Sequence, residues 1–379
     1  MIYIAKDIPL WQVTIWDKKF NNVDKKWQPK TIKYKYLLSD ELDSLRVDDG
    51  DVRILYTGKD VGFTTEELAG DRLSEGEIIS IPWGGIPTVK YHKGKFVTGD
   101  NRIATSKDIN KLTNKYLYYF MRGNIHEIAS YYRGASLKHP CMKDILKMTI
   151  SYPSVQEQDK ICGQFDVLEQ IIEVRKQELQ LLDDLIKARF VEMFGNPDLN
   201  EKEWDINKME RLCEVSSSKR IYQNEQSVIG IPFLRISDLV NRMDTGSKEC
   251  DLYIPEEKYE ELKDQGLVPI KGDILLTARG TLGRCYIIQE NDEFYFQDGM
   301  ITWLSNFNEK ITSLYIAYLF SMPGFRKQID ALQAGSTVAY LSISMTKKLD
   351  IMVPPIELQN QFADFVHQVD KSKVVEIIN

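Results

Sequence analysis

Cysteine is scarce in this sequence and long apolar runs are missing from it. Five cysteines occur among 379 residues, at positions 141, 162, 213, 250 and 285, and the closest pair is 21 residues apart. This spacing excludes a Cys-x-x-Cys zinc ribbon and argues against a disulfide framework, so we expect buried small hydrophobes in a reducing compartment. No basic segment followed by an apolar one stands at the start, and no run of about 18 apolar residues occurs anywhere. We therefore expect a soluble, cytoplasmic protein.

The motifs of common catalytic sites are also missing. The sequence holds no Gly-x-x-x-x-Gly-Lys-Ser/Thr, no Gly-x-Gly-x-x-Gly and no Asn-Pro-Pro-Tyr, and its four histidines lack metal-ligand spacing. Glu256-Glu257-Lys258 is the one candidate for half of a metal-dependent nuclease site. No suitably placed Asp on an apolar strand accompanies it, so a solvated charge run beside Pro255 is the preferred interpretation. We expect a non-catalytic chain without a metal site.

Length and charge point to two folded domains with an uneven surface. A chain of 379 residues exceeds what one core uses, and 43% hydrophobic residues exclude a disordered chain. The net charge of −7 argues against a wholly basic nucleic-acid binder. However, residues 90–150 carry twelve basic and four acidic side chains, whereas residues 154–194 carry five basic and nine acidic ones. One domain surface is therefore basic, although the chain is acidic.

Two amphipathic helices are the clearest local features. Between Val155 and Phe194 the only helix breaker is Gly163, and Gly195-Asn196-Pro197 follows as a stop signal. A seam of apolar residues recurs there with alternating steps of four and three, interrupted by arginines: Ile161, Phe165, Leu168, Ile172, Leu179, Leu182, Ile186 and Met193. This pattern predicts a helix of four to five heptads. A second helix of about 24 residues is expected after Pro354-Pro355, and the sequence ends within it.

The two helices close two copies of one unit. With a shift of 201 residues, Gly134–Gln158 aligns without a gap on Gly335–Gln359, and Gly, Lys, Ile, Pro and Gln are identical at five positions. Two further segments repeat at similar shifts: Gly76–Ile79 on Gly272–Leu275, and Tyr116–Met121 on Tyr315–Phe320. Strands are expected first and a helix late in each copy, without regular alternation, which favours an α+β domain. The expected strands are 52–56, 78–81 and 96–97 in the first copy, with 274–277, 285–288 and 294–296 as their analogues.

Each copy carries a glycine-rich turn with basic neighbours, which is a candidate DNA contact. In the second copy, residues 277–284 place Arg279, Gly280, Thr281 and Arg284 between two expected strands. Glycine lets the backbone approach closely, Thr can bond a phosphate, and Arg can form a fork with guanine or phosphate. The corresponding stretch of the first copy contributes aromatic, glycine and lysine residues: Trp83, Gly84, Gly85, Lys90, Lys93 and Lys95. An ordinary hairpin corner is the alternative for each turn alone.

Small hydroxyl and basic residues elsewhere complete the candidate DNA-binding set. Ser336 and Thr337 precede the second helix, and Ser136 and Lys138 precede the first, in positions suited to backbone phosphate contacts. The segment Ser216-Ser217-Ser218-Lys219-Arg220 is either a flexible loop or a phosphate-binding one, with Lys219 and Arg220 as its charged members.

These residues together resemble the DNA-specificity subunit of Type I restriction-modification systems. The resemblance rests on the segments that introduce the two helices, Ile150–Gln158 and Ile351–Gln359, and on the phrases Ile8-Pro9-Leu10-Trp11 and Trp204-Asp205-Ile206 that open the two copies. It covers essentially the whole chain. The motifs are individually loose but specific in this order and spacing.

The resemblance implies a division into four segments. These are a target-recognition domain at 1–152, a helix at 153–195, a second target-recognition domain at 196–353 and a shorter helix at 354–379. In the family the two helices pair as an antiparallel coiled coil and act as a ruler between the halves of a bipartite DNA site. The resemblance also implies partners: two methyltransferase subunits, which modify adenine, and a restriction subunit. S-adenosylmethionine, ATP and magnesium are expected on those partners and no cofactor on this chain.

A protein from another functional class remains as the alternative. A coiled-coil adapter whose two similar domains bind protein would agree with the net negative charge and with the 19 tyrosines. Salt dependence distinguishes the two hypotheses, because phosphate contacts make affinity fall steeply with salt and a protein interface responds weakly. A nuclease is a third possibility, which would require cleavage by the purified chain alone with Mg²⁺.

Overall fold

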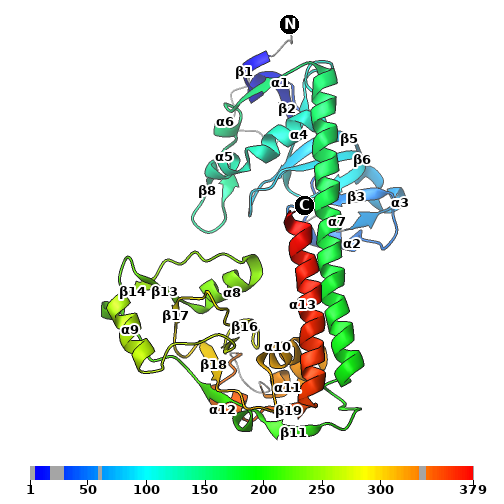
Figure 1. Ribbon diagram of the computed structural model, residues 1–379. Helices are drawn as coiled ribbons and strands as arrows, with labels where there is room; N and C mark the ends of the chain where they lie inside the picture. Colours follow the sequence, from blue (N-terminus) through cyan, green and yellow to red (C-terminus); the bar gives the residue numbers. More distant parts are fainter. Residues whose placement is uncertain (1–4, 18–29, 59–61, 333–338, 379) are drawn as a thin grey trace. The chain divides into compact units, whose positions relative to one another are not determined.

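The protein, seen as a computed structural model, consists of two compact units, residues 1–174 and 175–379 (Figure 1). The structure describes residues 5–17, 30–58, 62–332 and 339–378. A single long helix, α7 (Val155–Phe194), contributes its first half to the first unit and its second half to the other. Because the units divide α7 itself, the four predicted segment boundaries stay predictions. Within the described ranges, every helix is too short or too polar to cross a membrane.

The first unit is built on a mixed sheet with the strand order β2-β7-β5-β6-β3-β4 among the described residues. Only β3 and β6 run parallel there. Its strands are β1 (Ala5–Pro9), β2 (Thr14–Trp16), β3 (Val52–Leu55), β4 (Phe63–Thr64), β5 (Ser74–Pro82), β6 (Lys90–Thr98), β7 (Asn101–Ser106), β8 (Tyr132–Arg133), β9 (His139–Pro140) and β10 (Thr149–Tyr152). Its helices, besides α7, are α1 (Leu10–Val13), α2 (Ser39–Ser44), α3 (Glu66–Ala69), η1 (Gly70–Arg72), α4 (Asn114–Gly123), α5 (Ile125–Ser130) and α6 (Met142–Ile145).

The second unit holds a sheet of order β12-β18-β15-β16 and a smaller one of order β14-β13-β17. Its strands are β11 (Asp205–Lys208), β12 (Glu214–Ser216), β13 (Ile231–Leu234), β14 (Tyr253–Ile254), β15 (Ile274–Thr277), β16 (Cys285–Ile287), β17 (Tyr295–Phe296), β18 (Ile301–Ser305) and β19 (Asp350–Val353). Its helices are η2 (Met209–Arg211), η3 (Gln223–Glu225), α8 (Ile236–Thr245), α9 (Glu256–Asp264), α10 (Ser313–Ser321), α11 (Pro323–Leu332), α12 (Ile343–Lys347) and α13 (Ile356–Ile378). The expected α+β class and all six expected strands are confirmed.

The two units repeat the same strand pairing. The antiparallel set β2-β7-β5-β6 of the first unit has its counterpart in β12-β18-β15-β16 of the second. The parallel pair of β3 with the end of β6 corresponds to the parallel pair of β13 with β17. In addition, the opening strand pairs with the strand before the long helix in both units, as β1 with β10 and β11 with β19. The two opening phrases of the sequence therefore lie on or beside the strands that close each domain.

The register of the repeat differs from the sequence alignment by one residue. The alignment placed Ile79 on Leu275, but Ile79 pairs with Ala104 and packs in the core beneath α4, as Ile274 pairs with Leu304 beneath α10. Leu275 packs on the opposite face of its sheet. Both strands are buried on both faces, so no alternation of polar and apolar residues shows which face a given residue occupies. An alignment error of one residue therefore exchanges the two faces. Ile79 therefore corresponds to Ile274, which makes the alignment in this segment wrong by one position.

A buried glutamine fastens the first turn of each long helix to its domain. Gln158 of α7 is 0% exposed; its Oε1 accepts from Thr113 N (2.9 Å), and its Nε2 donates to Lys111 O (2.7 Å) and Pro153 O (2.9 Å). Gln359 of α13, also 0% exposed, accepts from the backbone N–H of Thr312 and donates to the carbonyls of residues 310 and 354, each at 2.9 Å. A single amide thus satisfies three buried backbone groups from two segments. This geometry explains why glutamine stands at this position in both copies.

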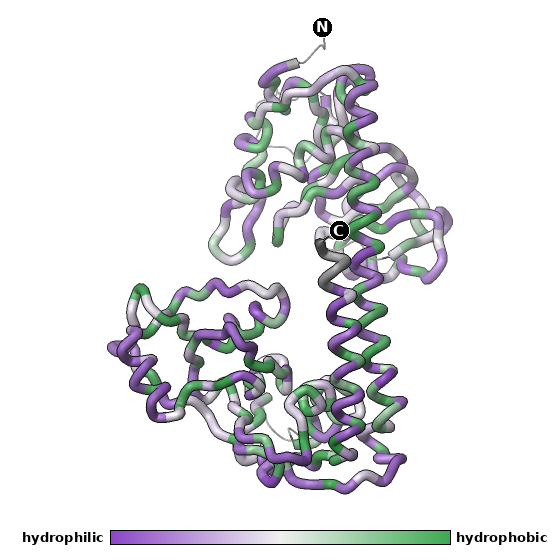
Figure 2. Tube along the Cα trace, viewed as in Figure 1, coloured by the Kyte–Doolittle hydropathy of each residue, from purple (hydrophilic) through white to green (hydrophobic). Residues whose placement is uncertain are grey.

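The helices α7 and α13 pair antiparallel within the second unit. Near the start of α13, Phe362 packs edge-on against Phe190 and Phe194 of α7, at 5.5 Å between ring centroids. Farther along, Lys373 Nζ lies 2.7 Å from a carboxylate oxygen of Asp183. Hydrophobic and hydrophilic residues alternate along both helices (Figure 2). The predicted helices and their antiparallel pairing are confirmed.

The predicted apolar seam of α7 is buried in its second half only. Ile186 and Met193 are 1% and 7% exposed, whereas Leu168 and Ile172 are 52% and 54% exposed. Phe165, also half-exposed, stacks on Tyr119 of α4 at 4.8 Å. The five cysteines are free thiols; Cys162 and Cys213 are buried as expected, and the other three are half-buried.

We predict that Gln158→Ala destabilises the first unit much more than Gln164→Ala does. The first change leaves three buried backbone groups without a partner and should lower the free energy of unfolding by about 2–4 kcal/mol, since each such group costs about 1–3 kcal/mol. Gln164 is exposed on the same helix, and its removal should change stability by less than about 0.5 kcal/mol. Urea denaturation followed by tryptophan fluorescence measures both. Equal midpoints for the two variants would contradict the fastening role.

Candidate nucleic-acid interface

Three loops of the second unit converge at one end of its larger sheet. Because β12, β18 and β15 alternate in direction, the ends of β12 and β15 lie beside the start of β18. Ala278 N donates to Met300 O (2.9 Å), and Ser217 Oγ donates to Ile301 O (3.3 Å). The structure therefore brings the predicted turn at 279–284 and the predicted pair Lys219 and Arg220 to the same end of the sheet. Lys219 and Arg220 are exposed there.

The turn that follows β15 is held in a fixed shape. Gly280 and Gly283 have φ angles of 69° and 75°, which side chains rarely adopt. Thr277 Oγ1 donates to Thr281 O (2.6 Å) and accepts from Arg284 N (3.0 Å), so one buried hydroxyl bridges the turn. The side chains of residues 279 and 281 are exposed at its tip. A turn fixed in this way loses little entropy when it contacts a ligand.

The three arginines at this end of the sheet differ in their ion-pair partners. Arg284 forms an ion pair with Asp244 (2.6 Å), and Arg220 forms one with Asp298 (2.8 Å). The hydrogen bond from Arg284 holds the pKa of the Asp244 carboxyl below its usual value. Arg279 has no carboxylate within ion-pair distance among the described residues, and its guanidinium lies over the ring of Tyr340 at 5.0 Å. Of the three arginines, Arg279 is therefore the one whose charge is not already neutralised.

The corresponding end of the sheet in the first unit carries the turn after β5. Trp83 N donates to Asp100 O (2.9 Å), and Gly85 N donates to Lys138 O (3.3 Å). The ring of His139 lies tilted against that of Trp83, at 5.2 Å between ring centroids, and its Nδ1 donates to the carbonyl oxygen of Trp83 (2.6 Å). The predicted residues Trp83, Gly84, Gly85, Ser136 and Lys138 therefore lie together, with Ser136 and Lys138 exposed.

The lysines of β6 are not gathered at this turn. Lys90 lies at the near end of β6 but donates to the carbonyls of Tyr56 and Gly58. Lys93 and Lys95 lie farther along the strand, opposite Glu77 and Glu75. Lys93 is exposed there, whereas Lys95 forms an ion pair with Glu66. Ser336 and Thr337 lie outside the described residues. For all the predicted residues at the two turns, contact with DNA stays a prediction.

The sequence analysis missed three side chains that support the turns at these ends of the two sheets. Tyr340 and His139 occupy equivalent places before α12 and α6, and each supports a neighbouring turn. Arg102 is 1% exposed beneath Trp83; it pairs with Asp17 at 3.1 Å and with Asp100. The signal for the first two was the shift of 201 residues, which aligns His139 with Tyr340. No local pattern marks Arg102, whose partner Asp17 is 85 residues away.

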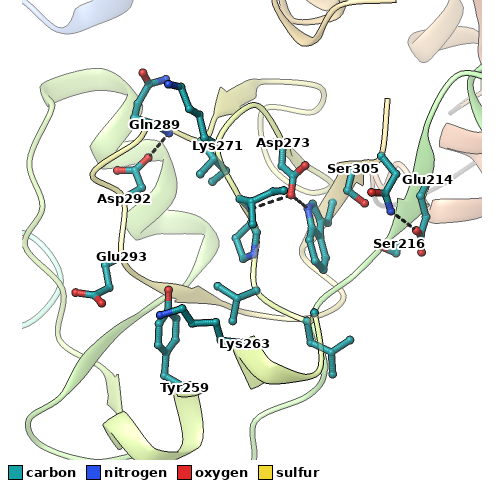
Figure 3. A pocket seen from close by; sticks show the side chains of 18 of the residues that line it. Glu214, Ser216, Tyr259, Lys263, Lys271, Asp273, Gln289, Asp292, Glu293 and Ser305 are labelled. Atoms are coloured by element: carbon teal, nitrogen blue, oxygen red, sulfur yellow. Dashed lines mark hydrogen bonds between the residues drawn. The ribbon is translucent and has the colours of Figure 1, made fainter. Parts of the chain in front are cut away.

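A large hollow of the second unit is chemically unsuited to phosphates. This pocket of about 870 Å³ is lined by five acidic residues, Glu214, Asp273, Glu290, Asp292 and Glu293, against the two lysines Lys263 and Lys271 (Figure 3). The buried Asp273 accepts hydrogen bonds from the indole of Trp303 (2.8 Å) and the backbone of Ile270 (3.0 Å). Burial raises the pKa of the Asp273 carboxyl. The hollow is therefore chemically different from the basic turn.

Lys258, from the nuclease candidate Glu256-Glu257-Lys258, lies on α9 and forms ion pairs with Glu225 and Glu261.

Comparison with known proteins decides the family. The family described as Type I restriction modification DNA specificity domain matches residues 42–183 and 201–379, one match in each half of the chain. The chain belongs to this family. It is therefore a specificity subunit, the DNA-recognition component of a type I restriction-modification system and not a catalytic one.

Relatives and solved structures agree with this membership. A Haemophilus influenzae protein assigned as a type I restriction enzyme specificity subunit is 26% identical over 307 residues, covering 78% of this chain and 75% of that protein. The MjaVIII specificity subunit of Methanocaldococcus jannaschii is 22% identical over 335 residues, covering 82% and 76%. The crystal structure of the S subunit from M. genitalium has the same fold, with a TM-score of 0.56, 16% identity and coverage of 99% and 91%.

We predict that Arg279→Ala weakens binding to the target DNA more than Arg284→Ala does. Arg279 should contribute about 1–3 kcal/mol if it reaches a base, whereas Arg284 must give up Asp244 before it contacts DNA. Neither change should alter thermal stability by much, because both side chains lie on an exposed turn and leave no cavity. Titration of a labelled target duplex at fixed salt measures both affinities. Unchanged affinity in both variants would show that the turn faces away from DNA.

Proposed function

We propose that each unit reads one half of a bipartite DNA site and that the chain directs adenine methyltransferase and restriction subunits to that site. The observation that carries the proposal is the repetition: each sheet ends in a fixed turn, and each domain is fastened to a long helix by a buried glutamine. Two similar readers joined by one continuous helix suit two half-sites separated by a gap. Lys138, Lys219 and Arg279 supply exposed cations at the two turns.

The helix α7 also supplies a surface for partner subunits. In the first unit Val167, Ile171 and Val174 follow at helical spacing and are 54%, 51% and 52% exposed. Apolar residues exposed on one helix face are typical of a protein interface. We propose that the methyltransferase subunits, which carry out the methyl transfer, dock on this helix, with S-adenosylmethionine, ATP and magnesium bound by partners and not by this chain.

We predict that the purified chain alone has no methyltransferase, ATPase or nuclease activity. The sequence has none of the motifs for these reactions, and its family supplies the recognition component. Addition of the methyltransferase subunit of its own system should produce methylation of adenine at specific sites. Incorporation of labelled methyl groups, ATP hydrolysis and plasmid cleavage measure the three activities. Turnover by a preparation free of other subunits would contradict the prediction.

We predict that four residues inserted after Gln177 lengthen the gap between the half-sites. The insertion adds about 6 Å to the helix and turns it by only some 40° beyond a full turn. Because B-DNA rises about 3.4 Å per base pair, the preferred gap should grow by about one to two base pairs. The insertion point precedes the α7 residues that pack on α13, so their contacts are kept.

The insertion variant is tested in complex with its methyltransferase partner by sequencing the methylated sites. An unchanged gap would mean that α7 is a docking surface and not a ruler, and changed half-sites would mean that it helps to read bases. The adapter alternative is tested with the unmodified chain. A flat salt dependence of DNA affinity would favour the adapter.

A further inference from the structure

Arg279 of the second unit and Gly84 of the first occupy equivalent positions. Counting from the matched strand residues Ile79 and Ile274, the fifth residue onward is Gly84 in one unit and Arg279 in the other. The N–H of the preceding residue makes the same contact in both units, because Trp83 N donates to Asp100 O and Ala278 N donates to Met300 O, each at 2.9 Å. The preceding carbonyl also accepts a hydrogen bond in each unit. Leu341 N donates to Ala278 O (3.0 Å) in the second unit.

The first unit makes that contact by a different chemical route. Proline has no backbone N–H, and Pro140 stands where the second unit has Leu341. The ring of His139 takes over, because its Nδ1 donates to Trp83 O (2.6 Å). Trp83 O and Ala278 O therefore accept equivalent hydrogen bonds, and the next residues, Gly84 and Arg279, are structural counterparts.

In the first unit a side chain at this position would be crowded by its neighbours. A Cβ on Gly84 would lie 3.2 Å from Leu137 Cδ2 and 3.4 Å from His139 Cε1, both tighter than or at the limit of ordinary contact. In the second unit the same position projects an exposed arginine. The backbone is shared, but only one copy presents a hydrogen-bonding side chain from the tip of this turn.

The ring of Tyr340 lies against the Arg279 guanidinium. The ring lies 5.0 Å from the guanidinium carbon, and the two residues also form a backbone bridge. A guanidinium held over an aromatic face keeps its N–H groups directed outward and loses less entropy on forming a forked contact. Guanine presents two acceptors, O6 and N7, that match this fork. Arg220 and Arg284, by contrast, already direct their guanidinium groups at carboxylates.

We propose that Arg279 reads a guanine in the half-site of the second unit, with Tyr340 as its positioning residue, and that the first unit has no equivalent reader because Gly84 stands there. This inference rests on the proposed bipartite recognition and adds the base to it. One half-site then requires a G·C pair at the position that Arg279 reaches. The other half-site has no requirement from the equivalent position.

The experiment selects bound sequences from randomised duplex DNA, using the full chain in complex with its methyltransferase subunit. The variants are Arg279→Lys, which keeps the charge but loses the fork, Tyr340→Ala, and Tyr340→Phe, which keeps the ring. Arg211→Lys is the matched control, since Arg211 is exposed and precedes the start of β12, at the opposite end of the same sheet. The half-site that is not altered serves as an internal control for folding.

We expect Arg279→Lys to reduce the preference for guanine at one position of one half-site by about 10–100-fold, while the salt dependence of binding stays the same. Tyr340→Ala should weaken the same preference and Tyr340→Phe should restore it, which a merely structural role in the turn would not produce. Arg211→Lys should leave the preference intact.

The outcomes separate this inference from the function on which it rests. If the unmodified complex selects no common bipartite sequence, the proposed function fails. If it selects one but Arg279→Lys retains every position, or alters both half-sites, the assignment of Arg279 is wrong. If Tyr340→Phe behaves as Tyr340→Ala does, the ring is not what positions the arginine.

Discussion

The attachment of each long helix to its domain depends on one buried amide. Gln158 and Gln359 each join the first helical turn, the preceding proline and the loop before α4 or α10 through three hydrogen bonds. Unsatisfied buried backbone groups are costly, so the glutamine fixes where the helix leaves the domain. The direction of the helix relative to its sheet follows from that anchor, and the placement of the reading turn follows from the sheet.

The second half of α7 is part of the core of the second unit. Phe190 and Phe194 pack among Tyr315 and Phe362 and are buried, so α7, α10 and α13 share one aromatic cluster. The first half of α7 is held to the first unit by Gln158 and by the ion pair of Lys115 with Asp166 at 2.6 Å. The helix α7 is thus fastened to the first unit mainly by polar contacts and is built into the core of the second unit.

The two units show how one backbone supports different recognition chemistry. The same sheet end, the same turn and the same segment before a short helix recur, yet the positions at the tip are filled differently. With Pro140 in place of Leu341, the ring of His139 completes the hydrogen bond, and that ring crowds the space beside Gly84. The second unit uses a backbone N–H for the same purpose, so its turn is open for Arg279. The residue at the tip of the turn therefore differs between the units while the strand pairing beneath it is the same.

The sequence by itself determined the repeat, both long helices and six of the strands, because 3.5-residue periodicity, helix-stop residues and β-branched runs are local signals. Gln158 and Gln359 could be identified as equivalent, although not what they bind, since two of the three backbone partners of each are more than 40 residues away. The tertiary structure decided the phase of the repeat, because strands such as β5 and β15 are buried on both faces and carry no alternation that would fix it. It also decided which arginines are neutralised. The pairing of Arg284 with Asp244, 40 residues apart, and the open position of Arg279 depend on how distant loops meet at a sheet edge, which no local pattern encodes.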